Sequence, residues 1–176
     1  MWCNFQKYKY IWETVLRKLD VIFDETEPVE RTDSDVLNCI ELLSEQLQYS
    51  AKTKSSQPLI KQCKATEFSL TSKKNEAPRL VVVKEDDDSV SSCFVVGEGV
   101  RIDVGSSIKM ALTNLLFCYY VWDLSYPKQY QLLGFLQHYI LADRDNKFDM
   151  SSNYLKFTKK FDDVKLNESE VEDEMN

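Results

Sequence analysis

The stretch that decides the fold is residues 79–104, which read RLVVVKEDDDSVSSCFVVGEGVRIDV. It holds three short runs rich in β-branched residues, separated by an acidic break at 85–89 and by Gly97-Glu98-Gly99. Runs of this kind are typical of β-strands, and glycine supplies the positive φ angles that a tight reversal needs. The stretch therefore predicts three strands in an antiparallel meander.

Beyond Val104 the apolar residues change from a period of two to a period of about 3.6, which indicates a helix. Residues 108–122 read IKMALTNLLFCYYVW, so this helix is apolar on nearly every face. A membrane span needs about 20 apolar residues, and this run is shorter and is bracketed by Lys109 and Asp123. We therefore expect a buried core helix and no membrane span, with Ser106 or Ser107 as the helix cap.

A corner at Tyr126-Pro127 leads into a second helix, because proline disfavours a helical residue before it and suits the first turn of a helix. This helix carries apolar residues at helical spacing, namely Leu132, Leu133, Leu136, Tyr139 and Ile140. Residues 78–142 thus form the predicted core unit, a three-stranded antiparallel meander followed by two helices. The fold class expected for the chain is α+β.

Two amphipathic helices are predicted to form an N-terminal helical hairpin at 1–49. Trp12 lies on the apolar stripe of the first helix and Leu43 on that of the second, which begins at a capping box from Thr32 to Asp35. Neither stripe can stay exposed, so the hairpin packs on the core unit, pairs with another copy, or binds a partner. Trp12 and Leu43 are therefore the candidate interaction surface. For the first helix, a position on a membrane surface is the alternative interpretation.

The remaining segments carry weaker patterns. Residues 50–77 are rich in Ser, Lys, Thr and Gln and predict a flexible linker. Residues 143–161 predict a short amphipathic helix, and 162–176, with seven acidic residues and one lysine, predict a disordered acidic tail. We expect 147–176 to be dispensable for folding of the core unit, because the tail can bury little apolar surface.

A cluster of aromatic residues is the most unusual feature of the core unit. Its members are Phe117, Tyr119, Tyr120, Trp122 and Tyr126. Aromatic residues dominate both protein cores and binding surfaces, so the cluster alone does not separate the two. We expect it to belong to the core.

The sequence holds no pattern that indicates catalysis, a cofactor or a metal. Its five cysteines are widely spaced without a C-x-x-C pair, and its single histidine, His138, has no ligand cluster beside it in sequence. A nucleophilic pair of Cys118 with His138 would need an exposed thiolate, and Cys118 lies among aromatic residues. We therefore expect no enzyme activity, and we expect His138 to be a partly exposed polar position on its helix.

The composition limits the cellular compartments in which the protein is expected and the partners that it is expected to bind. An odd number of cysteines and no signal-peptide pattern favour a reducing compartment, so we expect an intracellular protein, cytoplasmic or nuclear, that is not secreted. The formal net charge is −7, and nearly all of it lies in the acidic tail. The rest of the chain is close to neutral, so composition argues neither for nucleic acid nor for a strongly basic partner, and we do not expect nucleic acid as a partner.

Residues 79–141 also show a family resemblance. Their apolar helix ends at a D-x-x-YP turn from Asp123 to Pro127, and the next helix carries an F-x-Q element from Phe135 to Gln137. This order resembles the C-terminal segment of uncharacterised animal proteins similar to sterile-alpha-motif-domain-containing protein 3. The resemblance covers about a third of the chain and implies the same fold for that part. It implies no activity, cofactor or catalytic residue.

The expected function follows from the apolar stripes of the hairpin and the aromatic residues of the core unit. Together they offer more apolar surface than one small sheet can cover. We expect a non-enzymatic intracellular protein-interaction or self-association module, with a protein partner or a homo-oligomer. The alternative is a nucleic-acid-associated protein derived from a mobile element or viral-type reading frame, which would use the lysines of 50–77.

Overall fold

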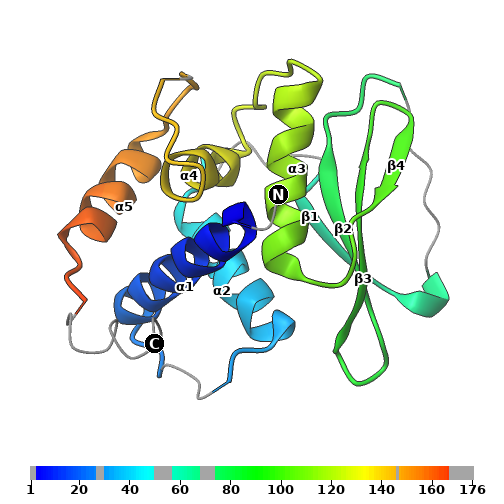
Figure 1. The fold of residues 1–176 in the computed structure, drawn as a ribbon. Helices are drawn as coiled ribbons and strands as arrows, with labels where there is room; N and C mark the ends of the chain where they lie inside the picture. Colours follow the sequence, from blue (N-terminus) through cyan, green and yellow to red (C-terminus); the bar gives the residue numbers. More distant parts are fainter. Residues whose placement is uncertain (1–2, 27–29, 50–56, 68–73, 146, 167–176) are drawn as a thin grey trace.

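Five α-helices lie on one side of a four-stranded mixed sheet in this computed structural model, which describes residues 3–26, 30–49, 57–67, 74–145 and 147–166 (Figure 1). The predicted α+β class is confirmed. The helix α3 (Ile108–Val121) stands between the sheet and the other helices. No described helix is both long enough and apolar enough to cross a membrane.

Three strands form the meander that the sequence predicts. They are β2 (Arg79–Lys84), β3 (Val90–Gly97) and β4 (Val100–Asp103), and each pairs antiparallel with the next. A tight turn joins β3 to β4, with positive φ angles of 52° at Glu98 and 75° at Gly99. Glycine adopts such an angle without steric cost, so Gly99 favours the reversal, and Glu98 rather than Gly97 takes the other positive angle.

A fourth strand, β1 (Ile60–Lys64), pairs in parallel with β2 at the edge of the sheet. It lies inside 50–77, so the prediction of a linker is corrected for these residues. Ile60 and Cys63 are half-buried, whereas the other side chains of the strand are exposed. Because this edge strand buries so little surface, its sequence has no run of apolar residues that would indicate a strand. Its extended conformation comes from pairing with β2.

One hydrophobic core joins the sheet to the helices. The helices α4 (Gln131–Tyr139) and α5 (Ser152–Asp163) extend this core on the side of α3 that faces away from the sheet. α4 begins later than the proline corner suggests, because residues 127–130 first form a turn in which Tyr130 N–H donates to the Pro127 carbonyl at 2.8 Å.

α5 corrects the expectation that residues 147–176 add nothing to folding. A helix is present where the sequence places one, but Tyr154, Phe157 and Phe161 are buried in the common core. These three side chains recur at helical spacing and lie against α4, where Phe157 and Phe161 contact Phe135 and Tyr154 contacts His138. Phe157 also contacts Phe23 of α1. The helix is therefore part of the fold rather than an appendage.

The N-terminal hairpin also belongs to this core. Its helices, α1 (Cys3–Phe23) and α2 (Asp33–Gln46), pack on each other and on the helices of the core unit. The predicted capping box is present, because Asp35 N–H donates to the Thr32 hydroxyl at 3.2 Å and Thr32 N–H donates to the Asp35 carboxylate at 2.8 Å. Of the alternatives that the sequence leaves open, the chain adopts the one in which the hairpin folds back.

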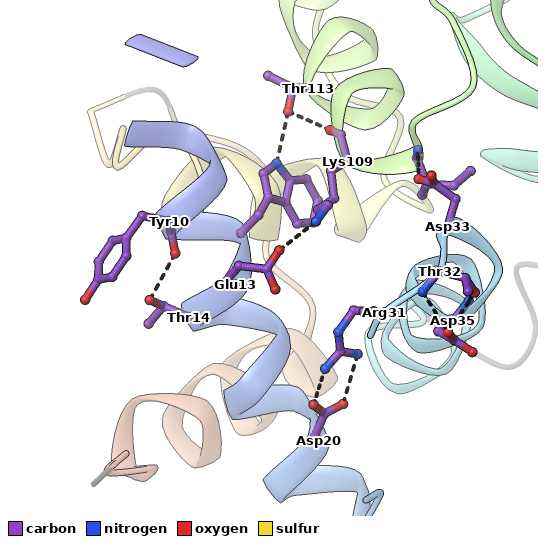
Figure 2. A network of polar contacts seen from close by, with 12 residues as sticks. Tyr10, Glu13, Thr14, Asp20, Arg31, Thr32, Asp33, Asp35, Lys109 and Thr113 are labelled. Atoms are coloured by element: carbon purple, nitrogen blue, oxygen red, sulfur yellow. Dashed lines mark hydrogen bonds and ion pairs between the residues drawn. The ribbon is translucent and has the colours of Figure 1, made fainter. Parts of the chain in front are cut away.

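Polar contacts hold α1 against α3 (Figure 2). Trp12 Nε1 donates to the Thr113 hydroxyl at 3.2 Å, and that hydroxyl donates to the Lys109 carbonyl at 2.8 Å. The Lys109 ammonium group lies 2.6 Å from the Glu13 carboxylate. These contacts satisfy the polar atoms at a junction that is otherwise apolar.

The first residue of α3 is capped from another helix. The backbone N–H of Ile108 donates to Asp33 Oδ1, at the start of α2, over 2.6 Å (Figure 2). Ser107 occupies the cap position without making a side-chain cap hydrogen bond. The serine cap expected from the sequence is therefore replaced by a carboxylate, which also suits the positive end of the helix dipole.

Asp33→Ala is expected to lower the free energy of unfolding by about 1–2 kcal/mol, because a partly buried N–H at the start of α3 loses its acceptor. Ser107→Ala is the matched control and is expected to change the free energy of unfolding by less than about 0.5 kcal/mol. Urea unfolding followed by circular dichroism measures both variants. If Asp33→Ala and Ser107→Ala lowered the free energy of unfolding equally, the assignment of the cap to Asp33 would be contradicted.

Candidate functional site

Trp12 and Leu43, the residues expected to form an interaction surface, lie in the core. Their exposed fractions are 2% and 0%. Both belong to the same cluster as Leu80 and Val82 of the sheet, so the apolar stripes of the hairpin are covered within the chain. This corrects the expectation, and a surface for a partner has to lie elsewhere on the molecule.

α3 leaves one face uncovered near its C-terminal end. Phe117, Tyr120 and Val121 lie on that face at helical spacing, with exposed fractions of 39%, 37% and 78%. We call these three residues the α3 patch. Tyr8 of α1 lies beside it, because its ring meets that of Phe117 edge to face with centroids 6.5 Å apart. The aromatic cluster is therefore divided, with Tyr119 in the core and Phe117 and Tyr120 at the surface.

A cleft of about 690 Å³ opens beside the α3 patch. Its walls come from the end of α3, the turn that follows it, one residue of α4 and the segment 147–149. Four of the ten residues that line it are aromatic, namely Tyr119, Tyr120, Tyr126 and Phe148. We call it the aromatic cleft. Tyr120 belongs to both the patch and the cleft, so the two form one continuous surface.

The D-x-x-YP turn builds one wall of the aromatic cleft. The chain reverses at Asp123, whose φ is 51°, and Leu124 N–H donates back to the Tyr119 carbonyl at 2.9 Å. The turn then places the ring of Tyr126 against that of Tyr119, with centroids 5.3 Å apart. Tyr119 is itself anchored, because its hydroxyl donates to the Pro78 carbonyl at 2.7 Å.

Phe148 forms another wall and lies directly on α4. A Cβ atom at Gly134 would lie 1.9 Å from the Phe148 ring, so only glycine allows the ring to approach the helix this closely. The ring also packs against Tyr126, at 6.0 Å, and Tyr154, at 5.2 Å between centroids. Sequence reasoning missed Phe148, because nothing local indicates that it returns to the end of α3.

One hydroxyl group of the cleft is bonded to a nearby carboxylate. The Tyr120 hydroxyl donates to Asp143 Oδ2. Burial has the largest effect on Tyr126 and raises its pKa well above the usual range. The neighbouring Tyr120 and Asp143 raise this pKa further. Tyr126 is therefore a neutral phenol at physiological pH.

Cys118 and His138, which the sequence analysis considered as a nucleophile and base, have surroundings that do not suit that chemistry. Burial raises the pKa of the Cys118 thiol, so it is not a thiolate at neutral pH. His138 is only 8% exposed, and its Nδ1 lies 2.7 Å from the Tyr154 hydroxyl. The expectation of a partly exposed histidine is corrected, because α5 covers it.

The free energy of unfolding is expected to fall as the pH drops below 6.5. Burial lowers the pKa of His138 in the folded chain below its ordinary value of 6.5, and the positive charge of Arg144 lowers it further. The unfolded chain then binds the proton more readily. The contribution of neutral His138 to folding stability is complete above the pKa that His138 has in the unfolded chain. It is lost as the pH falls through the lower pKa that His138 has in the folded chain. Urea unfolding between about pH 8 and 5.5 measures the loss. His138 is the only histidine in the sequence, so a slope that persists in His138→Gln would contradict this origin.

No three side chains of His, Cys, Asp or Glu gather at metal-binding positions in the part of the chain that the structure describes. The lysines Lys61 and Lys64 lie exposed on β1, where the Lys64 ammonium group is 3.7 Å from the Asp86 carboxylate, and Lys52, Lys54 and Lys73 lie outside the described residues. The expected absence of a metal and the nucleic-acid alternative both stay predictions.

Comparison of the chain with protein-family models, with curated proteins and with solved structures finds no match. The resemblance of residues 79–141 to proteins similar to sterile-alpha-motif-domain-containing protein 3 therefore stays a prediction.

Proposed function

We propose that this protein is a non-enzymatic protein-interaction module that binds its partner through the α3 patch and the aromatic cleft. The observation that carries the proposal is the exposure of Phe117, Tyr120 and Val121 beside a cleft of about 690 Å³. Large apolar side chains gathered on one helix face gain free energy when a partner removes them from water. Tyrosine and phenylalanine are also enriched at protein interfaces.

Contacts within the chain account for only part of the α3 patch, because Phe117 packs on Tyr8 and Tyr120 bonds to Asp143, yet both side chains stay more than a third exposed. The opposite face of α3 supplies the residues that anchor it in the core, among them Ile108, Leu112 and Leu115. Val121 is 78% exposed, and valine is a weaker helix former than the polar residues lysine or glutamine. A valine beside two exposed aromatic rings is therefore best explained by contact with another molecule.

The proposal places the protein inside the cell. The described cysteines Cys39, Cys63, Cys93 and Cys118 are free thiols, which supports a reducing compartment. Burial raises the pKa of Cys39 and of Cys93 to about 12, so neither is reactive at neutral pH. The partner is another protein or a second copy of this chain.

Val121→Asp tests the proposal, because it places a charge in the α3 patch at a position that the fold leaves open. Leu155→Asp is the matched control, since Leu155 is 55% exposed on α5 and away from the patch. Immobilised full-length chains are incubated with cell extract, and the retained proteins are quantified by mass spectrometry. We expect proteins that the native chain and Leu155→Asp retain equally and that Val121→Asp retains about tenfold less.

Light scattering of the same three chains tests association between copies. If a second copy is the partner, the mass falls towards 20.6 kDa in Val121→Asp but not in Leu155→Asp. Identical retention by both variants, together with an identical mass, would overturn the proposed function. Circular dichroism melts confirm that both variants are folded before binding is compared.

A further inference from the structure

We infer that an exposed face of α5 binds an acidic segment of the same chain, residues 167–176. The face consists of Lys156, Lys159 and Lys160, and we call it the α5 lysine face. Three features support the contact: the exposed positive charge of the face, the negative charge of the segment, and the point at which the segment leaves the fold. No residue of α5 lines the aromatic cleft among the described residues, so this surface is separate from the one that the proposed function uses.

The α5 lysine face lies where the core leaves α5 open. α5 is the helix furthest from the sheet (Figure 1), and all three lysines are exposed. The Lys160 ammonium group donates to the Ile22 carbonyl of α1 at 3.4 Å, but none of the three lysines forms an ion pair with another described residue. Like charges one turn apart on a helix repel one another, so an anion placed on the face relieves this repulsion.

The acidic residues close to α5 leave this charge in place. The Asp162 carboxylate accepts a hydrogen bond from the Tyr139 hydroxyl at 2.8 Å, on the side of the helix that meets α4. Asp163 is exposed in the last turn of α5, and Asp24 and Glu25 are exposed beyond the end of α1. No ion pair among the described residues joins any of these carboxylates to the α5 lysine face.

The acidic segment follows α5 almost directly. Residues 167–176 read NESEVEDEMN, with five acidic residues and no basic one. The segment starts next to Leu166, three residues beyond the end of α5 at Asp163. Ten residues of extended chain span at most about 33–36 Å, whereas the 12 residues of α5 are about 18 Å long. The segment is therefore long enough to return along the whole helix.

The spacing of the acidic side chains also fits the lysines. In an extended chain every second side chain lies on the same side, about 6.6 Å apart, and Glu168, Glu170 and Glu172 alternate in this way. Two helical residues four positions apart, such as Lys156 and Lys160, are separated by about 6 Å along the helix axis. A segment that returns antiparallel to α5 can therefore set successive glutamates against successive lysines.

The contact depends on the covalent connection to α5. An exposed ion pair contributes little by itself, and salt weakens it further. A short connection gives the segment an effective concentration in the millimolar range, which favours binding within one chain. While the segment lies on the α5 lysine face, a second acidic protein or a nucleic acid has to displace it. The segment therefore restricts access of polyanions to α5.

Zero-length cross-linking of the full-length chain tests the contact. A carbodiimide joins a carboxylate to a lysine where the two touch, and mass spectrometry of the digest identifies the linked pairs. We expect the glutamates of the segment to link to Lys156 and Lys160 at least about fivefold more often than to Lys9 and Lys61, which are exposed on α1 and β1. In about 0.5 M salt we expect the links to α5 to fall at least about threefold. Links to Lys165, which is close in sequence, are the reference for proximity alone.

Charge reversal of the face is the second test. Lys156→Glu combined with Lys160→Glu is compared with the matched control, Lys9→Glu combined with Lys61→Glu, after circular dichroism has confirmed that both are folded. Two-dimensional NMR of the full-length chains reports the amide signals of residues 168–174. We expect these signals to move in the α5 variant at low salt and to stay in place in the control. Signals that are identical in the native chain and both variants would overturn the inference.

A mixture of ¹⁴N- and ¹⁵N-labelled chains separates contact within one chain from contact between two copies. Links within one chain join peptides that carry the same label, and this is the expected result. Links that join differently labelled peptides as often as equally labelled ones would place the segment on a second copy and overturn the assignment to the same chain. The proposed function is tested by Val121→Asp on α3, so either proposal can fail without the other.

Discussion

A chain that ends at residue 146 is expected to be largely unfolded at room temperature. The truncation removes Tyr154, Phe157 and Phe161, whose exposed fractions are 1%, 7% and 2%. Burying one such side chain contributes roughly 1.5–3 kcal/mol, so the expected loss is on the order of 5 kcal/mol or more. Typical domains are stable by about 5–15 kcal/mol, which leaves the truncated chain with little or no net stability.

The truncation also uncovers α4. Phe135 is fully buried in the complete chain, and its ring lies 6.1 Å from that of Phe157 and 5.1 Å from that of Phe161. Without α5, this ring and the His138 side chain meet water on a helix that is apolar on most of its surface. New binding of a hydrophobic dye is therefore expected alongside the lost stability.

Thermal unfolding followed by circular dichroism measures the effect of the truncation. A chain that ends at residue 166 is the matched control, because it keeps α5 and removes only a segment rich in acidic residues. The control is expected to melt like the full chain. A chain ending at 146 that loses less than about 1 kcal/mol would show that α5 is not part of the cooperative fold.

Trp12→Ala is expected to lower the free energy of unfolding by about 3–5 kcal/mol. The side chain of Trp12 is 2% exposed and belongs to the core that joins α1 to the sheet. Its replacement leaves a cavity and removes the hydrogen bond to the Thr113 hydroxyl. That hydroxyl keeps its bond to the Lys109 carbonyl, so most of the loss is due to packing.

Urea unfolding at several protein concentrations separates a core role of Trp12 from an interface role. Because the contacts of Trp12 lie within one chain, the loss is expected to be the same at every concentration. Tyr10→Ala is the matched control, since Tyr10 lies on the same helix with 48% of its surface exposed, and a change below about 0.5 kcal/mol is expected. A loss that grows on dilution would instead place Trp12 between two chains.

The candidate site could be predicted only in part. The aromatic cluster and the D-x-x-YP turn are visible in the sequence, and both contribute to the cleft. The sequence does not show which of the aromatic residues are exposed, because α3 is apolar on nearly every face. Exposure of Phe117 and burial of Tyr119, two residues apart, depend on where other elements cover the helix. Phe148 joins the cleft only through folding.

The sequence by itself determined the elements whose signals are local. The meander of β2, β3 and β4, the start of α2 at its capping box, and the helical state of α3 depend on residues only a few positions apart. Tertiary structure alone decided that β1 is a strand, that Asp33 rather than Ser107 caps α3, and that Trp12 and Leu43 are buried. The physical reason is that backbone preferences act over a few residues, whereas burial and pairing depend on surfaces that only the folded chain brings together.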